Sequence, residues 1–384
     1  MTARTPGFQA IQLTRARLAR GLTRIALGDA VQRSAPTVSK WESGQQTPDP
    51  AALVRLAEVL RVPRGYFLDT PFEPGTRPRF FRSMDNATKR ARERIEQYLT
   101  WLQRLGHDLQ TWVDLPAPNL PELDIGDFRL LRERDIEEAA FRVRAHWGLG
   151  RAPIPDLLLV LENAGIVCGR CSFGAPSIDG VSHWSSADDR PYVLISSDKR
   201  TAVRSRFDAA HELGHLVLHR HVDPTALAHR EAFKELEYQA HRFAGAFLMP
   251  ADGFAGELPE VSLEAFRVLK PRWKTSIGAM IDRCNDLGLI SEVHAGRMFI
   301  SSCARGWARG EPDDEILPIE QPRLMERCIR LLLRQGCFSV ERLLDRLRLA
   351  PGDIEALAGL PTGMLSNGGA HIALLPTPGQ RTRS

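Results

Sequence analysis

The chain has 384 residues, 43% of them hydrophobic and 26% charged, which predicts a globular protein of two or three domains. It has no apolar stretch of about 18 residues and no apolar signal-peptide core, which predicts a cytoplasmic protein without membrane contact, and its six scattered cysteines exclude a disulfide framework. The net charge of +4 is unevenly distributed, because residues 1–70 hold ten basic and five acidic side chains, as expected of a module that meets a polyanion.

Residues 8–68 have the pattern of short consecutive helices. The expected helices cover 9–20, 23–31, 35–42 and 50–60, with a last short turn near 63–65. Thr23, Ser34 and Asp49 stand at the start of three of them, where a side-chain oxygen can accept hydrogen bonds from unpaired backbone N–H groups. The sequence therefore predicts an N-terminal five-helix domain over residues 1–70.

Within this domain GLTRIALGDAV, followed by SAPTVSKWESG and a further helix, resembles the Xre/Cro-like helix-turn-helix family. The resemblance implies that residues 35–42 enter the major groove of a double-stranded DNA operator, and that two copies act together, which allows a homodimer. The candidate base contacts are Ala35, Thr37 and Lys40, and the candidate backbone contacts are Arg24, Arg33 and Ser34. Arg24 departs from the family pattern, because many relatives carry glutamine there.

Residues 71–122 form the next segment, a linker followed by a helix. The linker, PFEPGTRPRF, is rich in proline, glycine and arginine. A helix is expected over 88–113, because its apolar residues recur every three or four positions, like the seam of a coiled coil. The seam residues are Ile95, Tyr98, Leu102, Leu105, Leu109 and Trp112. So short a seam fits packing within the monomer as well as dimerisation.

A further domain is expected over residues 123–255. Its expected helices lie near 133–147, 155–164, 201–219 and 231–248, and its strands near 165–173 and 191–196. The third helix holds the sequence HELGH, with His211 and His215 four residues apart, so both imidazoles lie on one face and can reach one metal ion. Glu212 projects beside them, close enough to take a proton from water at that ion.

A metal site of this kind needs a third protein ligand. The next helix offers Glu237, which shares a face with Ala240, His241 and Ala244. The small alanines allow the two helices to approach closely, so Glu237 is predicted to reach the metal. Two imidazoles and a carboxylate suit Zn²⁺, with one position left for water. The position of Glu237 after HELGH favours the role of a metal ligand over that of an ordinary surface acid.

HELGH and the later pattern E-x-x-A-x-x-F-A-x-x-x-L-M-P together resemble the ImmA/IrrE family of metallopeptidases, over roughly residues 135–255. The resemblance implies an α+β zincin-like fold in which His211, His215 and Glu237 bind zinc and Glu212 is the general base. It also implies a bacterial or phage regulatory peptidase that cleaves a helix-turn-helix repressor.

Several other side chains could take part in such a site. His183 and His241 could stabilise an oxyanion, although each is more often an ordinary polar residue. His219 continues the row of histidines, and an exposed helix end is the favoured interpretation. Cys168 and Cys171 form a lone CxxC, which is expected to pack within a strand because no second cysteine pair accompanies it.

Residues 256–384 are expected to be mostly helical, with a regulatory or interface role. The helices lie near 263–269, 276–287, 324–333 and 340–349. The fold class is therefore mainly α with a small β-sheet: an N-terminal five-helix domain, an α+β zincin-like domain and a helical C-terminal region.

The sequence thus predicts a DNA-binding transcriptional regulator with a zinc-dependent endopeptidase. The enzyme would cleave a repressor-type protein, or its own chain within 71–121, in a stress- or phage-linked response. A competing hypothesis is a regulator whose metallopeptidase-like domain acts only as a sensor or interaction module. Glu212 argues against that alternative, because a purely structural metal site needs no general base.

Overall fold

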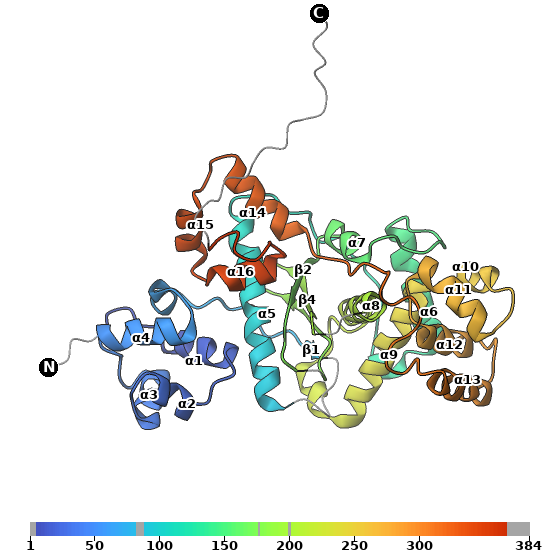
Figure 1. The fold of residues 1–384 in the computed structure, drawn as a ribbon, viewed down its shortest axis with the longest axis horizontal. Coiled ribbons are helices and arrows are strands. Elements are labelled where there is room, and N and C mark those ends of the chain that lie inside the picture. The colour runs from blue at the N-terminus through green and yellow to red at the C-terminus, as the bar shows by residue number, and fades with distance from the viewer. Residues whose placement is uncertain (1–4, 82–87, 176, 199–200, 367–384) are drawn as a thin grey trace, which may run out of the picture.

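The computed structural model describes residues 5–81, 88–175, 177–198 and 201–366. Helices surround one small sheet, and the N-terminal helices lie at one end of an elongated molecule (Figure 1). This architecture confirms the predicted fold class, mainly α with a small β-sheet. No helix within the described ranges is long and apolar enough to cross a lipid bilayer.

The N-terminal helices begin within one residue of the positions that the sequence predicts. They are α1 (Ala10–Ala19), α2 (Arg24–Ala30), α3 (Ala35–Glu42), α4 (Pro50–Leu60) and the 3₁₀-helix η1 (Arg64–Leu68). Thr23, Ser34 and Asp49 each accept a hydrogen bond from the backbone N–H three residues on, at 3.0, 3.3 and 2.7 Å. These caps satisfy N–H groups that the helices themselves leave unpaired.

A four-stranded sheet lies at the centre of the chain's remaining part. Its strands are β1 (Arg79–Phe81), β2 (Val167–Cys171), β3 (Gly180–Ser185) and β4 (Arg190–Ser196), in the order β1-β3-β4-β2. Only β2 and β4 are parallel neighbours. The sequence predicts β2 and β4 but neither β1 nor β3. All six residues of β3 are buried, so the polar-apolar alternation that marks a strand is absent.

The sheet is covered on both faces (Figure 1). The helices α5 (Lys89–Gln110), α14 (Leu324–Arg334) and α16 (Pro351–Ala358) cover one face, and α7 (Leu157–Asn163) and α8 (Ala202–Leu218) cover the other. Cys168 and Cys171 of β2 are buried in different cores, because residues three apart on a strand point to opposite faces. Burial raises the pKa of both thiols. This confirms packing as the role expected for the CxxC.

The apolar seam of α5 packs inside the monomer. Five of its six residues are buried in one core with the sheet and the N-terminal helices, and Trp112 lies just beyond the helix end, partly buried. Gly106 lies so close to β4 that a Cβ there would be 2.8 Å from Cε1 of Tyr192. Of the two uses open to the seam, dimerisation and packing within the chain, the structure shows the second.

The N-terminal helices dock on α5 and α16. Arg20 of α1 donates a hydrogen bond to Asp353 of α16 (2.9 Å), and its guanidinium lies 5.3 Å from the ring centroid of Trp101 on α5. Trp101 donates to the hydroxyl of Tyr66 (3.1 Å). A continuous hydrophobic core joins these helices to the sheet. The domain boundary predicted at residue 70 stays a prediction, and the core extends across it.

The other helices surround α8 or extend the C-terminal region. They are η2 (Phe128–Leu130), α6 (Glu133–His146), η3 (Pro224–Ala228), α9 (Arg230–Leu248), α10 (Ala251–Glu257), α11 (Leu263–Trp273), α12 (Ile277–Asp286), α13 (Glu292–Ala304) and α15 (Val340–Leu347). The part of the chain after residue 256 divides in two: α11 to α13 extend the core around α8, whereas α14 to α16 belong to the core around α5.

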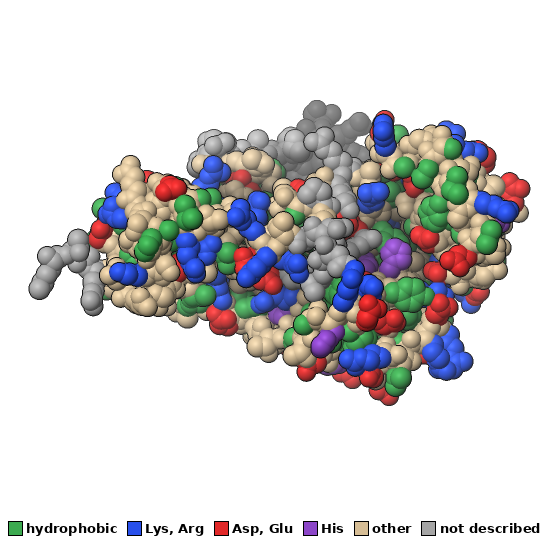
Figure 2. Space-filling model, turned by 90° about the horizontal axis from the view of Figure 1, so that it is seen from below, with side chains coloured by type: hydrophobic (Ala, Val, Ile, Leu, Met, Phe, Trp, Pro, Cys, Tyr) green, Lys and Arg blue, Asp and Glu red, His purple; other side chains and the backbone are tan. Residues whose placement is uncertain are grey.

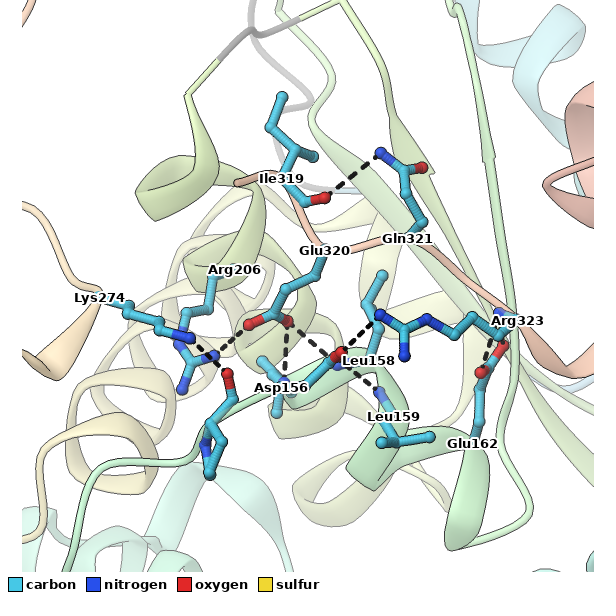
Figure 3. A network of polar contacts seen from close by, with 12 residues as sticks. Asp156, Leu158, Leu159, Glu162, Arg206, Lys274, Ile319, Glu320, Gln321 and Arg323 are labelled. Atoms are coloured by element: carbon cyan, nitrogen blue, oxygen red, sulfur yellow. Dashed lines mark hydrogen bonds and ion pairs between the residues drawn. The ribbon is translucent and has the colours of Figure 1, made fainter. Parts of the chain in front are cut away.

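Residues 319–323, which precede α14, lie beside the start of α7 and Arg206 of α8 (Figure 3). Glu320 accepts hydrogen bonds from two backbone N–H groups at the start of α7 (2.8 and 3.1 Å) and forms an ion pair with Arg206 of α8. Glu162 of α7 accepts two from the start of α14 (2.9 Å each). Glu320 thus caps the start of α7, and Glu162 of α7 caps the start of α14, so the two carboxylates tie α7 to the segment that leads into α14.

Candidate metal centre and nucleic-acid interface

The motif histidines lie on α8, which is buried along almost its whole length. It meets α9 at a contact between small residues. A Cβ on Gly214 would lie 3.1 Å from the Cα of Ala240, so the two backbones approach as closely as the sequence predicts. This approach brings the side chain of Glu237 to the two histidines.

Three side chains converge between these helices. Nε2 of His215 lies 3.1 Å from Nε2 of His211 and 3.2 Å from Oε1 of Glu237, and Nε2 of His211 lies 3.4 Å from Oε2 of Glu237. Ligand atoms bound at about 2.0–2.1 Å to a tetrahedral zinc ion lie roughly 3.3–3.4 Å from one another. The spacing of the three donors therefore fits zinc. Within the described ranges no other group of His, Cys, Asp and Glu side chains converges in this way.

Glu237 has the charge state that a metal ligand needs. Burial opposes its ionisation, but hydrogen bonds and charge interactions with His211 and His215 outweigh burial and hold the pKa of Glu237 below its usual range. An ionised carboxylate beside two imidazoles is a donor set that zinc prefers.

Glu212 is fully buried and lies between α8 and β3. A Cβ on Gly180 of β3 would come within 2.8 Å of its Oε1, so a larger residue at position 180 would displace the carboxylate. Glu212 follows His211 directly in the chain, and its carboxylate is confined to the space between the metal cluster's helix and the sheet. This position suits a general base that acts beside the metal.

His219 is a hydrogen-bond partner of His215 on the side of the ring away from Glu237. The sequence favours an exposed helix end as the position of His219. That interpretation is wrong, because Phe80 and Phe128 pack against His219 and bury it completely. Nδ1 of His215 lies 2.9 Å from Nδ1 of His219, whose Nε2 lies 2.9 Å from Oε1 of Gln239. Burial, together with His215, lowers the pKa of His219, so its ring is neutral. It can then accept one hydrogen bond and donate one.

Phe80 covers one face of His215. The two rings are stacked, with centroids 4.5 Å apart and planes 6° from parallel. The phenyl ring is buried in an apolar pocket, here called the Phe80 pocket, formed by Phe128, Ala226 and Leu236. The sequence places Phe80 in a linker, and a strand of three residues has no periodicity by which it could be recognised.

The other candidate histidines differ in their access to the cluster. His183 of β3 points to the opposite face of the sheet from Glu212, where Nδ1 lies 2.7 Å from Nε2 of Gln103 on α5, so it cannot serve as an oxyanion donor. His241 of α9 is exposed and packs on Phe207, one turn before His211 (4.8 Å between centroids). It borders a cavity of about 350 Å³ and stays a candidate.

The candidate DNA-contacting residues lie on α3, directly before it and, in the case of Arg24, at the start of α2, at the end of the molecule away from the sheet (Figure 1). Val38 and Trp41 are buried, as expected of the inner face of α3. Lys40 is exposed, and Ala35 and Thr37 are partly exposed on the outer side. Basic and acidic side chains are interspersed over the face seen from below (Figure 2).

The backbone-contact candidates have partners within the domain. Arg24 pairs with Glu42 (2.6 Å) and Arg33 with Asp49 (3.5 Å), although 53% and 36% of these arginine side chains remain exposed. Ser34 caps α3. A phosphate would therefore meet arginines already oriented by acids.

Two regions of the chain match known protein families. Residues 10–65 match the model of a helix-turn-helix domain, and residues 161–285 match the model of an IrrE N-terminal-like domain, a peptidase family. The first match covers α1 to α4, and the second runs from α7 to α12 and includes the metal cluster and Glu212. A search of curated proteins finds no match to the chain.

Proposed function

The chain joins a helix-turn-helix domain to an IrrE N-terminal-like domain of the ImmA/IrrE family, and we propose that it is a DNA-binding transcriptional regulator with a zinc-dependent endopeptidase activity. The observation that carries the enzymatic part is the convergence of His211, His215 and Glu237 at distances that suit zinc, with Glu212 alongside.

The chain's own residues account for the proton transfers of peptide hydrolysis. Zinc would lower the pKa of a bound water to about 7 and polarise the scissile carbonyl. Glu212 takes up the proton of the attacking water and returns it to the leaving amine. His219 accepts a hydrogen bond from Nδ1 of His215 and so keeps Nε2 of that ring turned toward Glu237. His241, on the exposed side, is the candidate donor to the oxyanion.

The substrate proposed is a repressor-type helix-turn-helix protein, or this chain itself within residues 71–121. A peptidase attached to a DNA-binding domain is concentrated where such repressors act, so the two domains together support a regulatory substrate. The response would be stress- or phage-linked, as the ImmA/IrrE resemblance implies.

One experiment tests the enzymatic part directly. Zinc-loaded wild type, Glu212→Gln and the control Glu231→Gln are incubated with candidate helix-turn-helix repressors and with the Glu212→Gln chain as a self-substrate. Wild type and the control, whose altered side chain is exposed on α9, should produce fragments. Glu212→Gln should bind zinc but cleave at least ~100-fold more slowly. Failure of zinc-loaded wild type to cut any of them contradicts the peptidase.

A second candidate is a regulator whose metallopeptidase-like domain only senses a ligand or partner. The observation that favours it is the position of Phe80, which covers His215 with a strand of the same chain. Under this alternative, zinc changes the affinity of the chain for its operator while no protein is cleaved. Operator binding measured with zinc and with a chelator, in wild type and in His211→Ala, distinguishes the two functions.

The DNA-binding part is tested on α3. Thr37→Ala combined with Lys40→Ala removes two outward-facing polar groups and leaves the buried Val38 and Trp41 in place. Binding to the chain's own promoter should weaken, because the outer face of α3 is expected to meet the bases. Unchanged binding would mean that another surface meets the DNA.

A further inference from the structure

Strand β1 occupies the edge of the sheet beside the metal cluster. It runs antiparallel to β3, with Phe80 opposite Ser182. A sheet edge carries unpaired backbone N–H and C=O groups, to which an extended peptide can add as a further strand. The edge of β3 is thus able to bind a peptide, and residues 79–81 of the chain's own linker fill it.

This edge leads past both parts of the candidate site. Gly180 of β3 lies against Glu212, and Ser182, two residues on, points to the same face of the sheet. Opposite Ser182, Phe80 stacks on His215. A strand paired with β3 therefore passes beside the base and a candidate ligand, and it directs one side chain into the Phe80 pocket.

We propose that the edge of β3 and the Phe80 pocket bind an extended peptide with an aromatic or large aliphatic side chain, and that β1 is an internal pseudosubstrate that competes for this site. Cleavage of such a peptide rests on the proposed function, whereas its binding does not. The pocket encloses Phe80 so fully that 3% of the residue is exposed, which favours a side chain of similar size.

β1 can leave this edge without disrupting the rest of the sheet. It has three residues, against a typical strand length of about five or six, and so forms few ladder hydrogen bonds. β3 stays paired with β4 on its other side. The segment that leads into β1 is held by polar contacts: Ser186 donates to the carbonyl of Pro74 (2.8 Å), Arg77 pairs with Asp189 (3.0 Å), and Nε2 of His183 on β3 lies 3.1 Å from the carbonyl oxygen of Arg77.

The linker also connects β1 to the helix-turn-helix domain. Arg15 of α1 donates a hydrogen bond to the carbonyl of Phe72 (2.8 Å) and pairs with Glu73 (2.8 Å). A shift of α1 on DNA binding would therefore displace the segment that leads into β1. The same contacts give the peptide site a physical connection to the DNA-binding domain.

A peptide-binding assay tests the competition. The probe is a fluorescein-labelled peptide with the sequence of residues 76–81 (TRPRFF), and full-length zinc-loaded Glu212→Gln protein is the parent, so that nothing is cleaved. Adding Phe80→Ala should raise peptide affinity at least ~10-fold in fluorescence anisotropy, because it weakens the internal competitor. Phe141→Ala removes an exposed phenyl ring on α6, which is not part of the Phe80 pocket, and should change nothing.

Equal peptide affinity of the Phe80→Ala protein and its parent overturns the proposal. If Phe80→Ala fails to fold, Arg77→Ala removes a partly exposed ion pair before β1 and should raise affinity about two- to fivefold; no increase there has the same consequence. Cleavage assays with Glu212 intact separate this result from the proposed function. Tighter peptide binding without any cleavage contradicts the peptidase and leaves the peptide site standing.

Discussion

In the helix-turn-helix domain the side chains expected to touch DNA stand at the surface of α3, whereas the candidate groups of the metal centre are enclosed by other elements. Lys40 is exposed and Thr37 partly so, but His211, His215 and Glu212 are at most 1% exposed. Each group of the centre also depends on neighbours from α9, β1 or β3. Substitutions in the centre should therefore have large effects that spread, and those on α3 small effects confined to one contact.

The largest effect is expected from Glu237→Ala. It removes the sole carboxylate of the cluster, and loss of a ligand should cost more than the roughly 10–100-fold in metal affinity that is typical of an outer partner. Zinc affinity, measured by competition with a chromogenic chelator, should fall more than ~100-fold. Glu231→Ala, on the same helix but with an exposed carboxylate, is the matched control. Wild-type zinc affinity in Glu237→Ala would remove Glu237 from the ligand set.

His219→Phe tests whether the hydrogen bond between His215 and His219 contributes to zinc affinity separately from the packing of the His219 ring. The phenyl ring keeps the volume between Phe80 and Phe128 but cannot accept a hydrogen bond from His215. Zinc affinity should fall about 10–100-fold, as is typical when an outer partner of a ligating histidine is lost. The exposed neighbour His221, changed to alanine, serves as the control. If zinc affinity stays at the wild-type value, His219 is a packing residue.

A smaller effect, on the pH dependence of the free energy of unfolding, is expected from replacing His183. This residue joins β3 to α5 on the face of the sheet opposite the metal cluster. Burial, and next Arg79, lower the pKa of His183 from 6.5 to about 3. The unfolded chain therefore binds a proton near pH 6.5 and the folded chain does not, so the free energy of unfolding falls as the pH drops from about 6.5 toward 3. Between pH 7 and 5.5 this loss should be about 1 kcal/mol.

The measurement is urea unfolding of wild type and His183→Gln at both pH values. Glutamine can donate and accept hydrogen bonds but does not titrate, so the variant should lack this part of the pH dependence. Other groups titrate equally in both proteins, and the difference between the two slopes isolates His183. Identical slopes would mean that His183 is protonated to the same extent in the folded and unfolded chains.

The helix-turn-helix domain and the metal centre also differ in how far the sequence predicts them. The helix-turn-helix domain is specified by local signals: Ser34 before α3 and Asp49 before α4 mark helix starts that the structure reproduces. The HELGH spacing is local as well, so the pairing of His211 with His215 on one helix face needs no tertiary information.

The rest of the metal centre depends on contacts between distant segments. β3 is buried on both faces and lacks alternation, and β1 becomes a strand only because the edge of β3 is there to pair with it. His219 is indistinguishable from an exposed helix end in sequence, because the residues that bury it lie on β1 and η2. Glu237 is the exception, because Ala240 and Ala244 on its face of the helix predict a close approach to the HELGH helix, and the family resemblance implies the same residue.

The smallest effect is expected from Lys40→Ala. This substitution tests whether a change at the surface of α3 affects a single contact only, in contrast to changes in the enclosed metal centre. An exposed lysine that meets a phosphate contributes a salt-dependent term, so its loss should weaken operator binding and reduce the slope of log affinity against log salt by about 1. Unfolding should be unchanged, because the side chain of Lys40 is exposed and the substitution keeps the backbone carbonyl that accepts from Gln46. Lys89→Ala on α5, where 89% of the side chain is exposed, controls for the loss of one positive charge. If Lys40→Ala lowered stability or altered zinc affinity, α3 would be coupled to the interior, and the contrast between an open interface and an enclosed centre would fail.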